Sequence, residues 1–488
     1  MLFNTLSYFV FLPVVVILFY SLPVRYRWML LLVASYFFYA CWEPAFLLLI
    51  LLTTLIVYLT ARLVEKENRQ PWRKCWLWVG ILVNLSILAV FKYAGFFQTI
   101  LSDLKIIKVS HSLNILLPVG ISFYTFQALA YLIDVYRRQL TAEKHFGHFA
   151  LFISFFPQLV AGPIERASRL IPQLKKSQTI INMADVSAGV KYLIYGLFKK
   201  VVIADNLSMW VNEVFQNPSI YNGFHYLVAA VLFTIQIYCD FSAYSDMAVG
   251  SARLLGIRLI QNFNLPFSAV SVSDFWKRWH ISLSSWFRDY VFLPLAWKVS
   301  KWKWLNGYSF LNNVMVYSVT ILFTFFLTGL WHGADYTFVI WGLLHGLCLI
   351  IEFSTKKIRI KFLKKIGINR KSNIYTILSR MLTFSFVVFA FIFFRADNLK
   401  EAIWMIKGIF SEWGAATFPE IPMQQYFMGG LAGLALLIFF ENSGKNISPE
   451  SFLSGKKIWL RWGFFYLLLA FIFMTGYFGN IEFIYFQF

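Results

Sequence analysis

Hydrophobic residues in this chain form long runs that short polar segments separate. Several runs reach the ~20 apolar residues that a helix needs to cross a bilayer. The apolar positions within a run are continuous and do not alternate over about 10 residues, as the strands of a membrane barrel would. Because backbone groups in lipid must hydrogen-bond within their own segment, this pattern predicts an all-α polytopic membrane protein.

The runs predict roughly ten to twelve membrane helices, together with re-entrant and interfacial helices. Glu43-Pro44 interrupts the run 28–62, and proline breaks helices, so this run is expected to form two helices or a kinked pair. Pro118 and Gly120 predict an irregular or re-entrant segment within 113–136. The remaining predicted spans are 6–22, 76–101, 226–255, 305–330, 337–351, 377–394, 426–440 and 459–477.

The distribution of charged residues indicates how the predicted helices are oriented in the membrane. Lys plus Arg number 44 and Asp plus Glu 23, a net charge of +21, and only 14% of the 488 residues are charged. The mean hydropathy is +0.64. Basic residues gather in short loops between apolar runs, above all at 356–371, as they do in cytoplasmic loops. The positive balance therefore indicates a membrane orientation and no nucleic-acid partner.

The four cysteines lie far apart, beside or within apolar runs. They are Cys41, Cys75, Cys239 and Cys348. Their positions show no metal-ligand spacing, so no metal site is predicted. All four are expected to be small buried hydrophobic residues.

The candidate chemistry begins at Trp331-His332-Gly333, which lies between two long apolar runs. An ionisable side chain at such a depth is costly and indicates a functional site. Histidine also suits proton transfer near neutral pH. The alternative is a helix-end histidine that hydrogen-bonds to a backbone carbonyl, and a motif this short does not decide between the two.

A second polar block, 262–290, is dense in Trp, Arg, Asp and Ser. It contains Asn-Phe-Asn-Leu-Pro-Phe and then Val-Ser-Asp-Phe-Trp-Lys-Arg-Trp-His-Ile-Ser-Leu-Ser-Ser-Trp-Phe-Arg-Asp-Tyr. Trp276, Trp279 and Trp286 have spacings that place them on one helical face, where they line a tunnel or face lipid. Asp240 and Asp246 lie in a predicted span and are expected to face the bundle interior or a cavity. An interior structural hydrogen bond is the alternative for both.

These two blocks together resemble the membrane-bound O-acyltransferase family. The resembling branch comprises the membrane subunits of bacterial alginate O-acetylation and their relatives that act on peptidoglycan and other envelope glycans. Further matching segments are 117–124, 156–164, 238–248 and the aromatic end 483–488. The resemblance runs through nearly the whole chain and is strongest between Leu116 and Ile351.

The resemblance implies one integral membrane domain over 1–488, with a bundle of the family's type around a central funnel. The catalytic core is expected at about 113–355, with N-terminal spans in 1–112 and C-terminal spans in 356–488. The expected location is the bacterial cytoplasmic (inner) membrane, crossed several times.

The resemblance also implies the site. His332 is the expected catalytic base. His280 is the expected second catalytic residue, which would hold the donor carbonyl or orient the acceptor, and an interfacial histidine in an aromatic, cationic helix is the alternative. Acetyl-coenzyme A is the expected acyl donor, with no bound cofactor. Substrate binding is expected from Trp331, Asp240, Asn262, Trp276, Lys277, Arg278, Trp279 and Arg288. The three cations suit phosphate binding, and anchoring at the membrane interface is their alternative.

His345 follows His332 by thirteen residues, about 220° around a continuous helix at ~100° per residue, and is expected to face elsewhere.

The implied function is export of acetyl groups across the membrane for O-acetylation of an envelope polysaccharide, alginate-like, peptidoglycan or another glycan. An extracytoplasmic acetyltransferase is the expected partner, besides membrane lipids. One alternative is D-alanyl transfer to teichoic acid from a carrier protein. The other is a transporter that moves a glycan or small molecule without chemistry, with Asp240, Asp246 and His332 as a proton relay.

Overall fold

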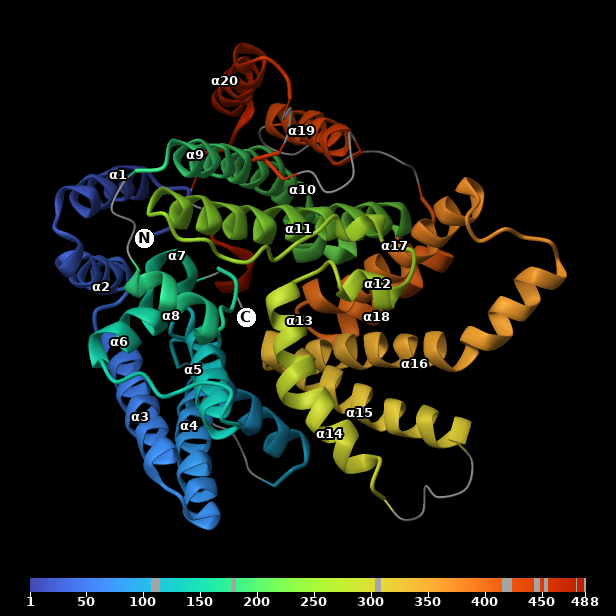
Figure 1. The fold of residues 1–488 in the computed structure, drawn as a ribbon. Coiled ribbons are helices and arrows are strands. Elements are labelled where there is room, and N and C mark those ends of the chain that lie inside the picture. The colour runs from blue at the N-terminus through green and yellow to red at the C-terminus, as the bar shows by residue number, and fades with distance from the viewer. Residues whose placement is uncertain are drawn as a thin grey trace. The chain divides into compact units, whose positions relative to one another are not determined.

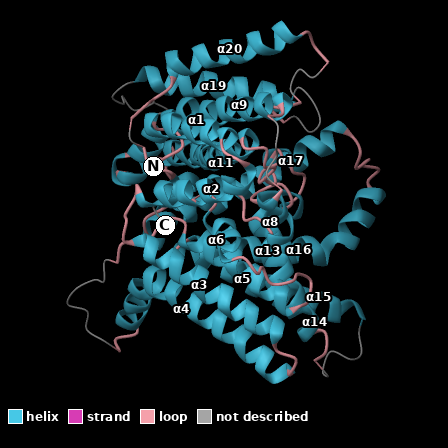
Figure 2. Ribbon diagram, turned by 60° about the vertical axis from the view of Figure 1, so that its left-hand side comes forward, coloured by secondary structure: helices cyan, strands magenta, loops and turns pink. Residues whose placement is uncertain are grey.

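The computed structural model describes residues 1–106, 115–160, 162–176, 181–302, 309–414, 424–442, 448–451, 455–479 and 481–486. Every regular element in these ranges is a helix (Figure 1). Figure 2 shows the same helices joined by loops. The all-α prediction is therefore confirmed for the part of the chain that the structure describes.

The α-helices differ widely in length, from single turns to more than thirty residues. They are α1 (Leu6–Ser21), α2 (Val24–Ala40), α3 (Phe46–Lys66), α4 (Gln70–Asp103), α5 (Ile121–Tyr136), α6 (Phe146–Ser154), α7 (Phe156–Leu159), α8 (Ala167–Lys175), α9 (Met183–Leu197), α10 (Asp205–Gln216), α11 (Gly223–Leu254), α12 (Val272–Trp276), α13 (Ile281–Phe287), α14 (Leu293–Val299), α15 (Ser309–His332), α16 (Tyr336–Lys365), α17 (Asn373–Arg395), α18 (Leu399–Ser411), α19 (Gln424–Asn442) and α20 (Ile458–Thr475).

Five short elements complete the described structure. Two are π-helices, η1 (Phe198–Ala204) and η4 (Arg288–Phe292), and three are 3₁₀ turns, η2 (Pro218–Ile220), η3 (Pro266–Ser268) and η6 (Ile484–Phe486). Single-turn π-helices are rare and frequently lie at functional sites.

Local sequence signals explain several helix boundaries. The interruption at Glu43-Pro44 separates α2 from α3, so the run 28–62 forms two helices as predicted. Gly120 adopts φ 76° just before α5, and a Cβ there would meet the carbonyl oxygen of Leu159 at 2.6 Å. The irregularity predicted within 113–136 is therefore confined to the approach to α5, since Ile121–Tyr136 is one regular helix. Residues 113 and 114 lie outside the described residues. Helix α16 continues to Lys365, so the basic stretch 356–371 is helical as far as Lys365 and forms a loop only after it.

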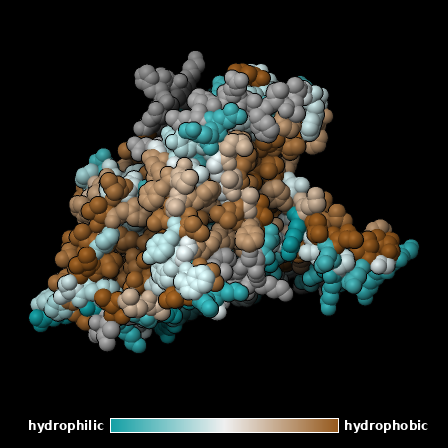
Figure 3. All heavy atoms as spheres, turned by 90° about the horizontal axis from the view of Figure 1, so that it is seen from above, coloured by the Kyte–Doolittle hydropathy of each residue, from teal (hydrophilic) through white to brown (hydrophobic). Residues whose placement is uncertain are grey.

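Seven described helices are long and apolar enough to cross a membrane by length and composition, namely α3, α4, α11, α15, α16, α17 and α20. The number is below the predicted ten to twelve, because several apolar runs form shorter helices, such as α1 and α5. Large apolar side chains cover much of the surface in Figure 3, and Leu6, Phe410 and Met474 are each at least 80% exposed. Such exposed apolar area suits lipid, and the protein is a multi-pass membrane protein.

The cysteine prediction is only partly right. Cys239 is buried and Cys348 is half-buried, but Cys41 and Cys75 are exposed. A membrane helix packs only part of its circumference against protein, so an apolar run does not by itself bury each of its small residues.

The described chain forms two compact units, each assembled from segments far apart in sequence. The first comprises 1–197, 243–261 and 448–469, and the second comprises 198–242, 262–447 and 470–488. The predicted core 113–355 contributes to both units. The prediction of one membrane domain over 1–488, with a central funnel, stays a prediction.

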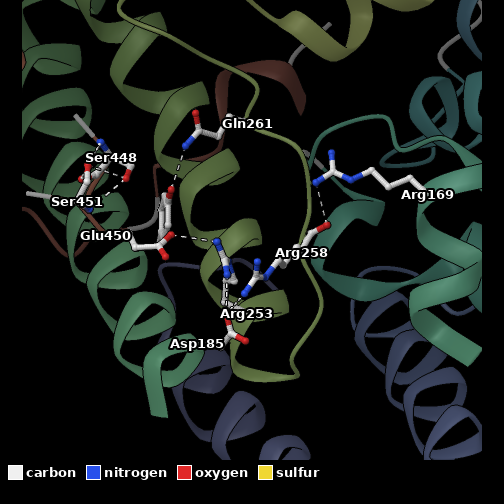
Figure 4. A network of polar contacts seen from close by, with 9 residues as sticks. Arg169, Asp185, Arg253, Arg258, Gln261, Ser448, Glu450 and Ser451 are labelled. Atoms are coloured by element: carbon white, nitrogen blue, oxygen red, sulfur yellow. Dashed lines mark hydrogen bonds and ion pairs between the residues drawn. The ribbon is translucent and has the colours of Figure 1, made fainter. Parts of the chain in front are cut away.

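A polar network in the first unit holds the end of α11 and the loop after it (Figure 4). Asp185 accepts from Arg253 at 2.6 Å and from Arg258 at 3.3 Å, and Arg253 also pairs with Glu450 at 3.0 Å. Gln261 donates to the Tyr192 hydroxyl at 3.1 Å. These contacts fix the loop that leads into the second polar block.

In the second unit α15 and α16 form an antiparallel pair whose backbones approach closely. A Cβ at Gly329 would run into the carbonyl oxygen of Phe338, and a Cβ at Gly342 into that of Phe325. Small residues at such positions let membrane helices pack tightly through van der Waals contact. This pair sets the direction in which the last residue of α15, His332, enters the interior.

We expect Gly342→Ala to lower the free energy of unfolding by about 1–3 kcal/mol, because the new methyl group meets backbone that can move only with its helix. Thermal unfolding of the purified protein in detergent measures the change. Gly463→Ala is the matched control, since nothing lies within 4 Å of a Cβ there. Equal unfolding temperatures for the two variants would contradict the close approach of α15 and α16.

Candidate active site

His332 is the last residue of α15 and is 3% exposed. Gly333 follows the end of the helix, and a Cβ at this position would overlap the ring of Phe338. Asp335 then caps α16, since its carboxylate accepts from the Thr337 backbone N–H at 2.8 Å. The Trp-His-Gly-Ala-Asp sequence thus builds a tight reversal that holds an imidazole at the end of a membrane helix.

Aromatic rings surround the His332 imidazole. The ring-centroid distances are 4.8 Å to Trp341, 4.9 Å to Trp331, 5.3 Å to Phe394 and 5.6 Å to Tyr485. Trp331, Trp341 and Phe394 are themselves buried. Such a setting excludes bulk water from the imidazole.

His280 lies between α12 and α13 and is completely buried. Its backbone adopts the left-handed conformation, φ 43° and ψ 55°, which is uncommon for a residue other than glycine. Strained conformations of this kind cost about 1–3 kcal/mol and cluster at functional sites. The break lets the imidazole face Phe241 at 4.6 Å and Trp331 at 5.8 Å between ring centroids.

Asn262 determines which ring nitrogen of His280 carries the proton. Asn262 Oδ1 accepts from the backbone N–H of Ser282 at 3.1 Å and from its hydroxyl at 2.9 Å, so this atom is the amide oxygen. His280 Nδ1 lies 3.1 Å from the same oxygen and must therefore donate. The neutral imidazole then has its lone pair on Nε2. Burial lowers the pKa of His280 to about 3, which keeps the ring neutral at physiological pH.

Tyr485 in η6 was not singled out in the sequence, yet it lies beside both histidines. Its ring centroid is 5.6 Å from His332, 6.5 Å from His280 and 4.3 Å from Phe241. The aromatic composition of 483–488 was the available signal, although composition does not reveal where that segment packs. Gln487 and Phe488 of that segment, and Ala161 of 156–164, lie outside the described residues.

Asp240 belongs to a buried ion cluster. Its carboxylate lies 2.8 Å from Lys200 Nζ, which is also 2.8 Å from Asp205, and all three side chains are at most 2% exposed. The second Asp240 oxygen accepts from the Ile484 backbone N–H at 2.8 Å. Asp246 lies in the other unit and is partly exposed. Within the described residues no group of three or more His, Cys, Asp or Glu side chains can hold a metal ion.

The predicted shared face of Trp276, Trp279 and Trp286 is wrong. Helix α12 ends at Trp276 and α13 begins only at Ile281, so the three tryptophans do not belong to one helix. All three are nevertheless buried inside the protein. The left-handed turn at His280 is the physical reason for the difference.

His345 also lies closer to the site than predicted. Its imidazole accepts a hydrogen bond from the Trp276 indole at 3.2 Å, and its ring centroid lies 5.0 Å from Trp341, the residue that also packs on His332. The 220° estimate assumed a continuous helix, but the chain reverses at Gly333. Both histidines therefore flank the same indole.

A cavity of about 380 Å³ lies in the second unit. Its lining includes Trp276, Lys277, Ser284, Arg288, Phe325 and Thr328. Trp276 links this space to the histidine site, since its ring lies 5.8 Å from Trp341.

The predicted cations separate into two groups. Lys277 and Arg288 line the cavity and are exposed. Arg278 instead pairs with Asp274 at 3.0 Å and donates to the Ser268 hydroxyl at 3.2 Å. Trp279 does not line the cavity either, and packs on Phe275 at 5.3 Å.

The fold and this site define a polytopic membrane protein with buried histidines beside a cavity that carries cations. Residues 143–394, which include both site histidines, match the model of the membrane-bound O-acyltransferase family. The chain belongs to this family and is an acyltransferase.

Curated relatives cover most of the chain. The protein is 38% identical to the probable alginate O-acetylase AlgI of Pseudomonas aeruginosa over 413 residues, 83% of this chain and 73% of that protein. It is 35% identical to the peptidoglycan O-acetyltransferase of Helicobacter pylori over 444 residues, 84% of this chain and 80% of that protein. Identity to the teichoic acid D-alanyltransferase of Bacillus subtilis is 31% over 284 residues, 58% of this chain and 69% of that protein.

The neutral state of His280 predicts a pH-dependent stability. Because its folded pKa lies below the unfolded value of ~6.5, the unfolded chain binds the extra proton, and stability falls as the pH drops below 6.5. This histidine should cost about 2 kcal/mol between pH 7.5 and pH 5. We expect His280→Asn to lose that part of the pH dependence.

Unfolding temperatures in detergent at both pH values measure this difference. Gly463→Ala, which changes no titratable group and adds a methyl group where nothing lies within 4 Å, supplies the control and should unfold with the pH dependence of the wild type. The same pH dependence in wild type and His280→Asn would show that the imidazole is not buried in its neutral form.

Proposed function

We propose that this protein moves acetyl groups from acetyl-coenzyme A across the cytoplasmic membrane of a bacterium for O-acetylation of an envelope polysaccharide, with His332 as the catalytic base. The observation that carries the proposal is the buried His332 at the end of a membrane helix, inside the segment that matches the family. Its aromatic surroundings exclude bulk water from the imidazole, and histidine is the side chain suited to accept a proton near neutral pH.

The reaction requires one proton to move twice. His332 takes the proton of a hydroxyl, and the hydroxyl oxygen attacks the thioester carbonyl carbon. The bond between this carbon and sulfur then breaks, and the leaving thiolate takes the proton from the imidazolium. The products are an acetate ester and free coenzyme A. His280 assists by accepting a hydrogen bond at Nε2, which suits orientation of a hydroxyl better than binding of the donor carbonyl.

The cavity beside Trp276 is the proposed donor site. Its walls are largely apolar, which suits a slender acetylated arm, while Lys277 and Arg288 supply charge-assisted hydrogen bonds to phosphates. Arg278, held by Asp274, keeps this turn in place. Asn262 supports His280 and Trp331 packs between the two histidines, so both shape the site rather than select the substrate.

The donor is cytoplasmic and an envelope glycan lies outside the membrane. A site built at the end of a membrane helix allows acyl transfer within the protein, with a separate extracytoplasmic transferase completing the modification. Alginate and peptidoglycan, on which the named relatives act, are the proposed classes of final acceptor.

The comparisons favour acetyl transfer over D-alanyl transfer. The acetylating relatives align over 83% and 84% of this chain, whereas the D-alanylating relative aligns over 58%. Membership of an acyltransferase family likewise argues against a transporter without chemistry.

We expect His332→Ala to remain folded and to lose at least a hundredfold in acetyl transfer, because general base catalysis typically contributes 10²–10⁴-fold. Release of label from radiolabelled acetyl-coenzyme A by membranes of the source cells measures the activity, with size-exclusion chromatography to check folding. His145→Ala, an exposed histidine outside the site, is the control. Wild-type turnover in His332→Ala would rule out the assigned base.

We expect Lys277→Ala and Arg288→Ala each to raise the KM for acetyl-coenzyme A about tenfold with little change in kcat. A lost hydrogen bond between charged groups costs about 1.5–3 kcal/mol, and both side chains line the cavity. Steady-state kinetics provide the measurement. Lys298→Ala removes an exposed lysine outside the cavity lining and should leave KM unchanged. Unchanged KM in both cavity variants would exclude this cavity as the phosphate-binding site.

A further inference from the structure

The buried ion cluster of the second unit ties together parts of the chain that lie far apart in sequence. We propose that Asp240, held by Lys200, is a positioning residue that fixes the turn 481–486 so that Tyr485 lies against His332 and His280. The inference rests on the proposed acyl transfer at His332. It gives Asp240 a different role from the substrate binding that the sequence suggested.

Both sides of the ion pair contact the backbone of this turn. Asp240 Oδ2 accepts from the Ile484 N–H at 2.8 Å, and Lys200 Nζ donates to the Ile481 carbonyl at 3.5 Å. A hydrogen bond from a backbone N–H to an ionised carboxylate is stronger than one between neutral groups. The cluster therefore holds the turn at two points, on either side of Phe483, which is fully buried.

The cluster places one ammonium group, that of Lys200, against the carboxyl groups of Asp205 and Asp240. Lys200 lies in the π-helix η1, which directs its ammonium group at two carboxylates, each 2.8 Å away. Burial raises the pKa of the Asp205 carboxyl, with Asp240 adding to the shift and Lys200 opposing it. Asp240 faces Lys200 with one oxygen and keeps the other, Oδ2, for the Ile484 N–H.

The turn delivers one aromatic side chain to the histidines. Tyr485 directly follows the anchored Ile484, and its ring centroid lies 5.6 Å from His332 and 6.5 Å from His280. Phe241, the neighbour of Asp240 in α11, supports that ring at 4.3 Å. The residue pair Asp240-Phe241 therefore fixes both the backbone and the ring of the turn.

This arrangement predicts a particular kinetic signature. The donor cavity does not include Asp240, Lys200 or Tyr485 in its lining. We therefore expect Asp240→Ala to lower kcat at least tenfold while the KM for acetyl-coenzyme A changes less than twofold. Asp240→Asn keeps an oxygen for the Ile484 N–H and should retain more activity than Asp240→Ala.

A double-mutant cycle separates positioning from a general structural role. If Asp240 acts through Tyr485, Asp240→Ala should reduce kcat less than twofold in a Tyr485→Ala background, against at least tenfold in the otherwise wild-type protein. Multiplicative losses in kcat would overturn the proposal. Glu441→Gln is the control, since Glu441 is an acidic residue of the same unit that accepts from the Tyr238 hydroxyl at 2.5 Å.

Hydrogen exchange of the C-terminal peptide gives a second readout that needs no activity. In Asp240→Ala the peptide that contains 481–486 should exchange faster than in the wild type, and in Glu441→Gln it should not. Wild-type protection of this peptide in a folded Asp240→Ala protein would overturn the proposal. Absence of acetyl transfer in the wild type would instead refute the proposed function and leave the anchoring to be judged by exchange alone.

Discussion

A polar group inside an apolar bundle needs a partner, because water is not available to solvate it there. This requirement accounts for most of the local structure around the two histidines. The amide oxygen of Asn262 serves three donors from His280 and Ser282. Lys200 lies between two aspartates, and the Trp276 indole donates to His345. Each of these hydrogen bonds and ion pairs restricts the orientation of the neighbouring side chain. The need to satisfy buried polar groups therefore fixes the geometry of the site.

Interruptions of helices place the site. His332 is the last residue of α15, and Lys200 belongs to a π-helix. His280 has a left-handed backbone conformation directly before α13. A regular helix distributes its side chains at fixed intervals, and these three positions depart from that regularity. The departures bring side chains from separate helices of the second unit to one region lined by aromatic rings. Among these three residues His280 has the strained backbone, and strain of this kind clusters at functional sites.

Much of this architecture could be predicted from the sequence, because hydrophobic runs and prolines act locally. The break at Glu43-Pro44 and the two helices on either side of His332 followed from such signals. The family motifs identified the region of both histidines, and the family match includes them.

Other features depend on contacts between distant residues, which local patterns cannot express. Lysines at the end of an apolar run usually indicate the membrane interface, and nothing near Lys200 in sequence reveals its partner Asp240. The position of His345 was wrong because the reversal at Gly333 resets the helical angle. The prediction that the three tryptophans share one helical face was wrong for a similar reason, since the left-handed residue His280 divides the segment into two helices. Tyr485 was missed because its neighbours lie in other parts of the chain.

The contact between Asp240 and Ile484 also bears on the order in which the protein is assembled. The two residues are separated by 244 positions in sequence. Helices are synthesised and inserted from the N-terminal side, so α11 enters the membrane long before the turn that completes its ion cluster exists. During that interval the carboxylate of Asp240 has Lys200 but not the backbone N–H of Ile484. The histidine site is consequently one of the last parts of the second unit to form, which leaves the growing chain inserted but chemically incomplete until synthesis has passed the turn.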